Sequence, residues 1–129
     1  MNSPYEQEIR YRLLKILSQD SYLTQREMSK RIGISLGKVN YCLSEFTKKG
    51  IIKIQRFKDS ESKIQYIYLL TPKGLEEKAR LTLNFFRRKV REYEEIKKQI
   101  RELAREVDNE GALKDISSED VLEVLNGVS

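Results

Sequence analysis

The chain has 129 residues, which is enough for one compact domain and an appendage but not for two full cores. It contains no histidine and one cysteine, Cys42, which rules out an internal disulfide, a multi-thiolate metal site and the commonest general base near neutral pH. We therefore expect no catalytic residues, no metal and no cofactor, and we expect that the protein is not an enzyme.

The net charge of +5 is unevenly distributed along the chain. Residues 1–75 carry 14 Lys or Arg against 7 Asp or Glu, residues 76–108 carry 10 against 8, and residues 109–129 carry 1 against 5. A basic head of this kind attracts polyanions such as nucleic acid, although its lysines could also serve solubility alone. No apolar run reaches the roughly 20 residues of a membrane span, and the N-terminus has no signal-peptide pattern. We expect a cytoplasmic protein with no membrane segment.

Three helix-start signals follow one another in the first 50 residues. Ser3 with Pro4 and Glu6 predicts a helix that runs to about Ser18. Residues 24–27 form a capping box that opens a short helix over 24–32, and Gly33 ends it. Ser35 caps a third helix, which Gly50 ends. The apolar side chains of this third helix recur on one face, at Val39, Cys42, Leu43 and Phe46.

After Gly50 the apolar period changes from helical to alternating. Residues 52–55 predict a strand, residues 58–63 a polar turn, and residues 64–70 a returning strand. Both faces of the returning strand are largely apolar, so its buried face stays open at this point. A β-hairpin is the expected structure.

A long helix is predicted from Leu75 to about Asp108, capped by residues 71–74 and free of proline and glycine. Its apolar residues recur at a spacing close to that of a coiled coil, and we predict dimerisation through Phe86, Val90, Tyr93, Ile96, Ile100, Leu103 and Val107. The expected organisation is a head over residues 1–74, a dimerisation helix over 75–108 and an acidic tail over 109–129. The tail is expected to hold a short helix over 117–126, and we hypothesise that it screens the basic head or packs on a neighbouring subunit.

This order of elements predicts a mainly α fold with a small β-hairpin wing: a winged helix-turn-helix head followed by a long coiled-coil-like helix. In a helix-turn-helix, the third helix lies in the major groove of DNA. Asn40 can bond adenine, Lys38 can reach guanine acceptors, and backbone N–H groups at the start of the second helix can bind a phosphate. The candidate DNA-binding residues are Thr24, Gln25, Ser35, Leu36, Lys38, Asn40, Tyr41, Ser44, Lys48, Arg56, Lys58 and Lys63.

Each of these polar residues has a plainer interpretation. The polar face of the third helix could simply be solvated, and the cations of the hairpin, Arg56, Lys58 and Lys63, could serve only solubility. Cys42 could be a redox sensor, but a lone cysteine on an apolar helix face is more often a small core residue.

Several segments resemble the MarR-type transcriptional regulators: residues 24–35, residues 46–52 and residues 70–74. Residues 33–43 are similar to the recognition helix of a short subgroup associated with bacterial exopolysaccharide gene clusters. The resemblance implies a winged helix-turn-helix fold and sequence-specific binding of double-stranded DNA as a homodimer. It also implies regulation of exopolysaccharide genes.

The chain departs from that family in two places. The winged domain begins almost at Met1, without the extra helix that helps to form the family's dimer and its phenolic-ligand pocket, so we do not expect a small-molecule effector. The usual Asp-x-Arg pattern of the wing is also missing, because Asp59 is followed by Ser60 and Glu61. Dimerisation then depends on the long helix, as a homodimer or a higher oligomer. The alternative is that this helix folds back on its own head and buries its apolar residues there. A protein-binding winged helix and an RNA-binding domain remain as alternatives to the DNA-binding regulator.

Overall fold

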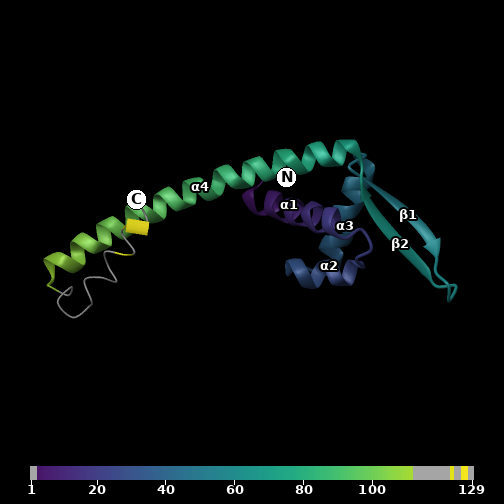
Figure 1. Ribbon diagram of the computed structural model, residues 1–129, viewed down its shortest axis with the longest axis horizontal. Coiled ribbons are helices and arrows are strands. Elements are labelled where there is room, and N and C mark those ends of the chain that lie inside the picture. The colour runs from purple at the N-terminus through teal and green to yellow at the C-terminus, as the bar shows by residue number, and fades with distance from the viewer. Residues whose placement is uncertain (1–2, 112–122, 124–125, 128–129) are drawn as a thin grey trace. The chain divides into compact units, whose positions relative to one another are not determined.

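The computed structural model describes residues 3–111, 123 and 126–127 of the chain. Its elements follow in the order α1 (Pro4–Gln19), α2 (Gln25–Ile32), α3 (Leu36–Lys48), β1 (Ile52–Lys58), β2 (Ile64–Leu70) and α4 (Pro72–Asn109) (Figure 1). The predicted fold class is confirmed: the chain is mainly helical, and β1 and β2 form a two-stranded antiparallel wing. The tail helix predicted over 117–126 falls almost entirely outside the described residues.

The first three helices begin at the capping residues that the sequence predicts. The side chains of Ser3, Thr24 and Ser35 each accept a hydrogen bond from a backbone N–H three residues further on, at 3.2, 3.1 and 3.1 Å. These bonds satisfy donors that have no partner inside the helix, so they define where each helix starts. Gly33 then ends α2 in the left-handed conformation, with φ 78°.

The core lies where α1, α2, α3 and the base of the wing meet. It consists of Ile9, Leu13, Leu14, Leu17, Leu23, Met28, Val39, Cys42, Leu43, Phe46, Ile51, Ile52, Tyr68 and Leu81. The predicted apolar face of α3 is therefore buried, and α4 adds Leu81, which the sequence analysis did not single out. A sealed apolar face on α3 leaves its opposite, polar face to the solvent.

Both strands of the wing contact the segment between α1 and α2. The backbone N–H of Tyr68 donates to the carbonyl oxygen of Ser21 at 2.9 Å, and the ring of Tyr22 meets that of Phe57 edge-on, with 6.3 Å between centroids. Tyr68 is buried, whereas Tyr66 and Ile64, two and four residues nearer the tip, are exposed. On the face that Tyr68 shares with Tyr66 and Ile64, burial increases toward the head, whereas Gln65, Ile67 and Leu69 on the other face are half-buried. Neither face of β2 is buried along its whole length.

The start of α4 is tied to the base of the wing. The hydroxyl of Thr71 donates to the carbonyl oxygen of Ile51 at 3.0 Å and accepts from the N–H of Gly74 at 3.0 Å. Gly74 is buried so closely against Ile51 that an added Cβ would lie far inside contact distance of its carbonyl oxygen. Residues 71–74 therefore cap α4 and also join it to the base of the wing.

Two compact units divide the chain, Met1–Phe85 and Phe86–Ser129. The boundary falls within α4, so the first turns of this helix belong to the same unit as the three short helices and the wing. In the described part of the chain, no helix combines the length and the apolar character that crossing a bilayer requires.

Candidate nucleic-acid interface

The polar face of α3 is open to solvent. Val39, Cys42, Leu43 and Phe46 point into the core, and at 100° per residue the side of α3 opposite to them carries Gly37, Asn40, Tyr41, Ser44 and Lys48. All five are exposed, and Tyr41 has 56% of its surface free. Because no core contact explains a tyrosine in this position, the face has the chemistry of a binding surface.

Two further candidates, Ser35 and Leu36, lie at the start of α3. Both are exposed, but the hydroxyl of Ser35 already accepts the N–H of Lys38 as the helix cap. Leu36 keeps 44% of its surface free beside the outward face. Only Leu36 therefore offers an unengaged side chain, and it is apolar, suited to a thymine methyl group.

Lys38 lies on the flank of α3 and contacts α1. Its Nζ is 2.8 Å from both carboxylate oxygens of Glu6 and 5.5 Å from the ring centroid of Tyr41. The hydrogen bond from Lys38 lowers the pKa of Glu6 below its ordinary value, and the same bond raises the pKa of Lys38. Lys38, which the sequence predicts to reach guanine, is thus occupied by a carboxylate in the free protein.

Asn40, on the outward face of α3, is connected to the wing through Gln25. The Nδ2 of Asn40 donates to the Oε1 of Gln25 at 3.4 Å, and the Nε2 of Gln25 donates to the hydroxyl of Tyr68 at 3.3 Å. Gln25 is the first residue of α2, and Tyr68 is in β2. The side chain of Gln25 therefore links α2 to both α3 and β2, beside the outward face of α3.

The N-terminus of α2 is less available to a phosphate than the sequence suggests. The carboxylate of Glu27 accepts from the backbone N–H of Thr24 at 3.5 Å and from its hydroxyl at 3.0 Å. This capping box engages the backbone N–H of Thr24, which the sequence predicts to bind a phosphate, so that phosphate contact stays a prediction.

One face of the wing combines cations with apolar side chains. In the antiparallel register Ile54 pairs with Tyr68, Arg56 with Tyr66 and Lys58 with Ile64, and directly paired residues share a face. Arg56, Lys58, Tyr66 and Ile64 are all exposed there. Since Tyr68 on this face bonds Gln25, the same face of the wing borders α2.

The tip of the wing is closed by Asp59. Its Oδ1 accepts the backbone N–H groups of Glu61 and Lys63, both at 2.9 Å, and its Oδ2 accepts from the Nε2 of Gln65 at 3.2 Å. These bonds, the one from Lys63 first, lower the pKa of Asp59. Lys63 also forms an exposed ion pair with Glu61 at 3.1 Å, so its charge at the tip is partly offset.

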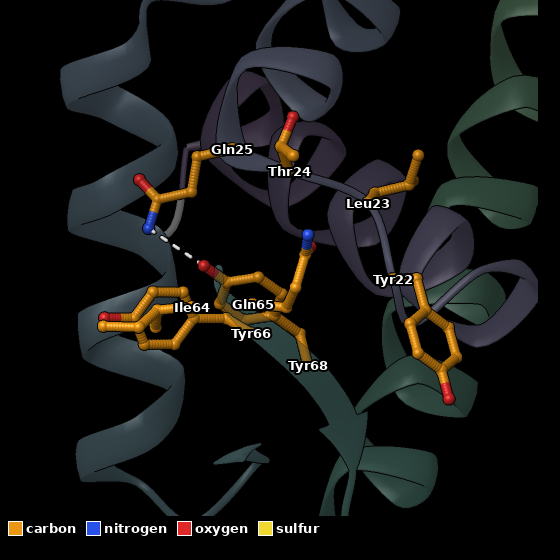
Figure 2. Close-up of a pocket in the computed structure, with 8 residues that line it drawn as sticks. All are labelled: Tyr22, Leu23, Thr24, Gln25, Ile64, Gln65, Tyr66 and Tyr68. Carbon is orange, nitrogen blue, oxygen red and sulfur yellow. Dashed lines mark hydrogen bonds between the residues drawn. The ribbon is translucent and has the colours of Figure 1, made fainter. Parts of the chain in front are cut away.

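A cleft of about 270 Å³ lies between the start of α2 and β2. Its lining consists of Tyr22, Leu23, Thr24, Gln25, Ile64, Gln65, Tyr66 and Tyr68. Figure 2 shows the hydroxyl of Tyr68 directed at the amide of Gln25 across this cleft. Tyr66 and Tyr68 were not among the predicted site residues, but the period-two spacing of Ile64, Tyr66 and Tyr68 places them on one face of β2 and could have indicated them.

The residues predicted for dimerisation lie along α4. Phe86, Val90, Tyr93, Ile96 and Leu103 keep 43–63% of their surfaces exposed, while Ile100 and Val107 are half-buried. Leu83, with 47% of its surface free, extends the same spacing by one step toward the head and was missed by the sequence analysis. A continuous apolar stripe on an otherwise charged helix is typical of a helix that meets a partner.

The side chains that commonly bind metal ions are scattered over the described part of the chain. Among those residues, no group of three His, Cys, Asp or Glu side chains is close enough together to hold an ion. Cys42, the one thiol of the sequence, is buried, and this burial raises its pKa.

Comparison with known proteins agrees with this geometry. Residues 6–53 match the family model described as winged helix-turn-helix DNA-binding. The match spans the region from α1 to the start of β1, and it agrees with the winged helix-turn-helix fold of the head. No curated protein sequence matches the chain.

The solved structures that share this fold include several MarR-family regulators. A MarR/EmrR family transcriptional regulator from Acinetobacter sp. ADP1 has 22% identity and a TM-score of 0.55, over 80% of this chain and 74% of that chain. The PcaV transcriptional regulator from Streptomyces coelicolor, in complex with its natural ligand, has 17% identity and a TM-score of 0.51, over 99% and 72%. The zinc-dependent MarR family regulator AdcR has 23% identity and a TM-score of 0.51, and this chain spans 60% of its length. At these identities the likeness shows a shared fold.

Proposed function

We propose that the chain is a transcriptional regulator that binds double-stranded DNA in a sequence-specific manner as a homodimer, in the cytoplasm and without catalysis. In this proposal α3 enters the major groove with Asn40, Tyr41 and Ser44 toward the bases. Lys48 and the wing cations Arg56 and Lys58 contact the sugar-phosphate backbone.

The observation that carries the proposal is the pairing of two exposed surfaces in one unit. The polar face of α3 and the cationic face of the wing are both open, and Gln25 links Asn40 to Tyr68 between them. Major-groove readout needs a helix with free polar side chains, and backbone contact needs cations beside it. A winged helix that binds protein would not need an open polar helix face beside an open cationic wing.

Salt dependence tests the DNA proposal. Affinity for duplex DNA should fall steeply with salt, and Arg56→Gln should make the log–log slope shallower by about 0.9, because one phosphate contact is lost. Lys53→Gln is the matched control, since Lys53 is exposed on the opposite face of the same strand. Equal effects of the two variants would indicate that Arg56 acts through the overall positive charge of the wing and not through a direct phosphate contact. Tighter binding of double-stranded RNA than of DNA would favour the RNA-binding alternative.

The homodimer is proposed from the apolar stripe on α4. Its residues, from Leu83 through Phe86, Val90 and Tyr93, recur in the alternating steps of three and four that let two copies of one helix pack together. Sedimentation equilibrium should show a dimer that Val90→Glu dissociates. Arg91→Glu, one residue off the stripe, should leave the dimer intact. A wild-type monomer at micromolar concentration would overturn the proposal.

Exopolysaccharide promoters are the first operators to test, because residues 33–43 resemble the recognition helix of regulators associated with such gene clusters. Selection of bound fragments from genomic DNA with the purified protein would show whether those promoters are enriched. Paired half-sites in the selected fragments would also support the dimer.

A further inference from the structure

The side chain of Gln25 contacts both the recognition helix and the wing. It donates from Nε2 to the hydroxyl of Tyr68 at 3.3 Å and accepts at Oε1 from the Nδ2 of Asn40 at 3.4 Å. Tyr68 has only 5% of its surface exposed, so its ring is held by the core while its hydroxyl faces the cleft. The two hydrogen bonds therefore connect the buried Tyr68 to the exposed Asn40.

An asparagine amide can present its oxygen or its nitrogen to a base, and the two orientations read different bases. Because Gln25 accepts one N–H of Asn40, the oxygen and the second N–H of that amide stay free. This remaining pair is the one that adenine requires, since adenine offers one donor and one acceptor in the major groove.

We propose that Gln25 is a specificity-determining positioning residue: held by Tyr68, it fixes the amide orientation of Asn40 so that α3 selects adenine. The inference rests on the proposed DNA-binding function and deepens it. It assigns Gln25 a role in base selection in place of the phosphate contact that the sequence predicts for it.

The test is selection of bound duplexes from a random pool, followed by affinity measurements on single-base variants of the selected site. The wild-type protein should prefer adenine by about tenfold at one position of each half-site, which Asn40→Ala should abolish. Gln25→Ala should reduce the preference at that same position several-fold and leave the other positions unchanged. Tyr68→Phe keeps the ring and removes the hydroxyl, so it should act in the same direction.

Gln25→Glu separates orientation from charge. A carboxylate can still accept from Asn40 and from the hydroxyl of Tyr68, so adenine preference should persist while overall affinity falls by repulsion from the phosphates. Gln55→Ala, an exposed glutamine on the other face of the wing, is the control and should change neither quantity. Thermal unfolding of each variant shows that the head is intact.

Two results would overturn the inference. If Gln25→Ala lowers affinity equally for all sequences, Gln25 is a backbone contact and not a positioning residue. If Gln25→Glu loses the adenine preference, the amide of Asn40 is oriented by another group. Failure of the wild-type protein to bind duplex DNA at all is a different result, since it rejects the proposed function itself.

Discussion

Lys38 of α3 and Glu6 of α1 form a bifurcated ion pair, with the Nζ of Lys38 2.8 Å from each carboxylate oxygen. The two residues are 32 positions apart, and both side chains are about one quarter exposed, 29% and 26%. The pair attaches the first turn of α3 to the first turn of α1. It also places a negative charge at the edge of the surface that we propose for DNA.

Replacing this carboxylate should strengthen DNA binding. Glu6→Gln removes a charge that repels phosphates and releases Lys38, so affinity at low salt should rise about three- to tenfold and the salt slope should steepen by about 0.9. Glu8→Gln is the control, because Glu8 belongs to the same helix but pairs with Arg12, at 2.9 Å. Fluorescence anisotropy over a salt series measures both the DNA affinity and its salt slope. An equal rise for the two variants would show that net charge alone is responsible.

The tip of the wing should depend on pH through Asp59. Its bonds from the N–H groups of Lys63 and Glu61 lower its folded pKa below the ordinary 3.8. A lowered folded pKa means that the stabilisation is complete above the unfolded value and is lost as pH falls through the folded value. The amide resonances of Glu61 and Lys63 should therefore shift together at acid pH, with a midpoint below the ordinary carboxyl value of 3.8. A midpoint above that value would contradict the assignment.

Asp59→Asn and Asp59→Ala distinguish hydrogen bonding from charge at the same tip. An asparagine oxygen can accept the same N–H groups, so Asp59→Asn should keep the amide positions and remove their acid transition. Asp59→Ala should change the amide positions and also remove their acid transition. Amide hydrogen exchange at Lys63 should become faster. Unchanged exchange in Asp59→Ala would mean that the strands alone hold the turn.

Gly74 and Gly37 should respond oppositely to the same substitution. A Cβ at Gly74 would overlap the carbonyl oxygen of Ile51, whereas one at Gly37 meets nothing within 4 Å. Gly74→Ala should lower the free energy of unfolding by about 1–3 kcal/mol, and Gly37→Ala should raise it by up to about 1 kcal/mol. Urea denaturation checks both. If DNA approaches the backbone of α3 closely, Gly37→Ala should nevertheless weaken binding.

Cys42 should behave as a core residue rather than as a redox sensor. It has 3% of its surface exposed, and burial raises the pKa of its thiol above the ordinary 9.0. In the native protein its reaction with a disulfide reagent such as Ellman's should therefore be limited by unfolding, and it should accelerate sharply in denaturant. Cys42→Ser should place a hydroxyl in the core and destabilise the fold, while Cys42→Ala should be milder. Rapid labelling without denaturant would contradict this.

Much of the fold could be predicted because its signals are local. Ser3, Thr24 and Ser35 bond backbone groups three residues away, so the residues that start each helix are neighbours in sequence. Likewise the buried face of α3 follows from a period of 3.6. The candidate interface was less predictable. Lys38 is exposed on a helical projection alone, and its engagement depends on where α1 places Glu6.

The sequence by itself determined the order of helices and hairpin, the apolar face of α3 and the stripe on α4, because caps, glycines and periodicity act within one element. Only the tertiary structure decided which polar side chains of the head are already engaged. The pairs Lys38–Glu6 and Gln25–Tyr68 join residues 32 and 43 positions apart. No spacing rule relates such residues, since their distance is set by how the helices and the wing pack around a common core.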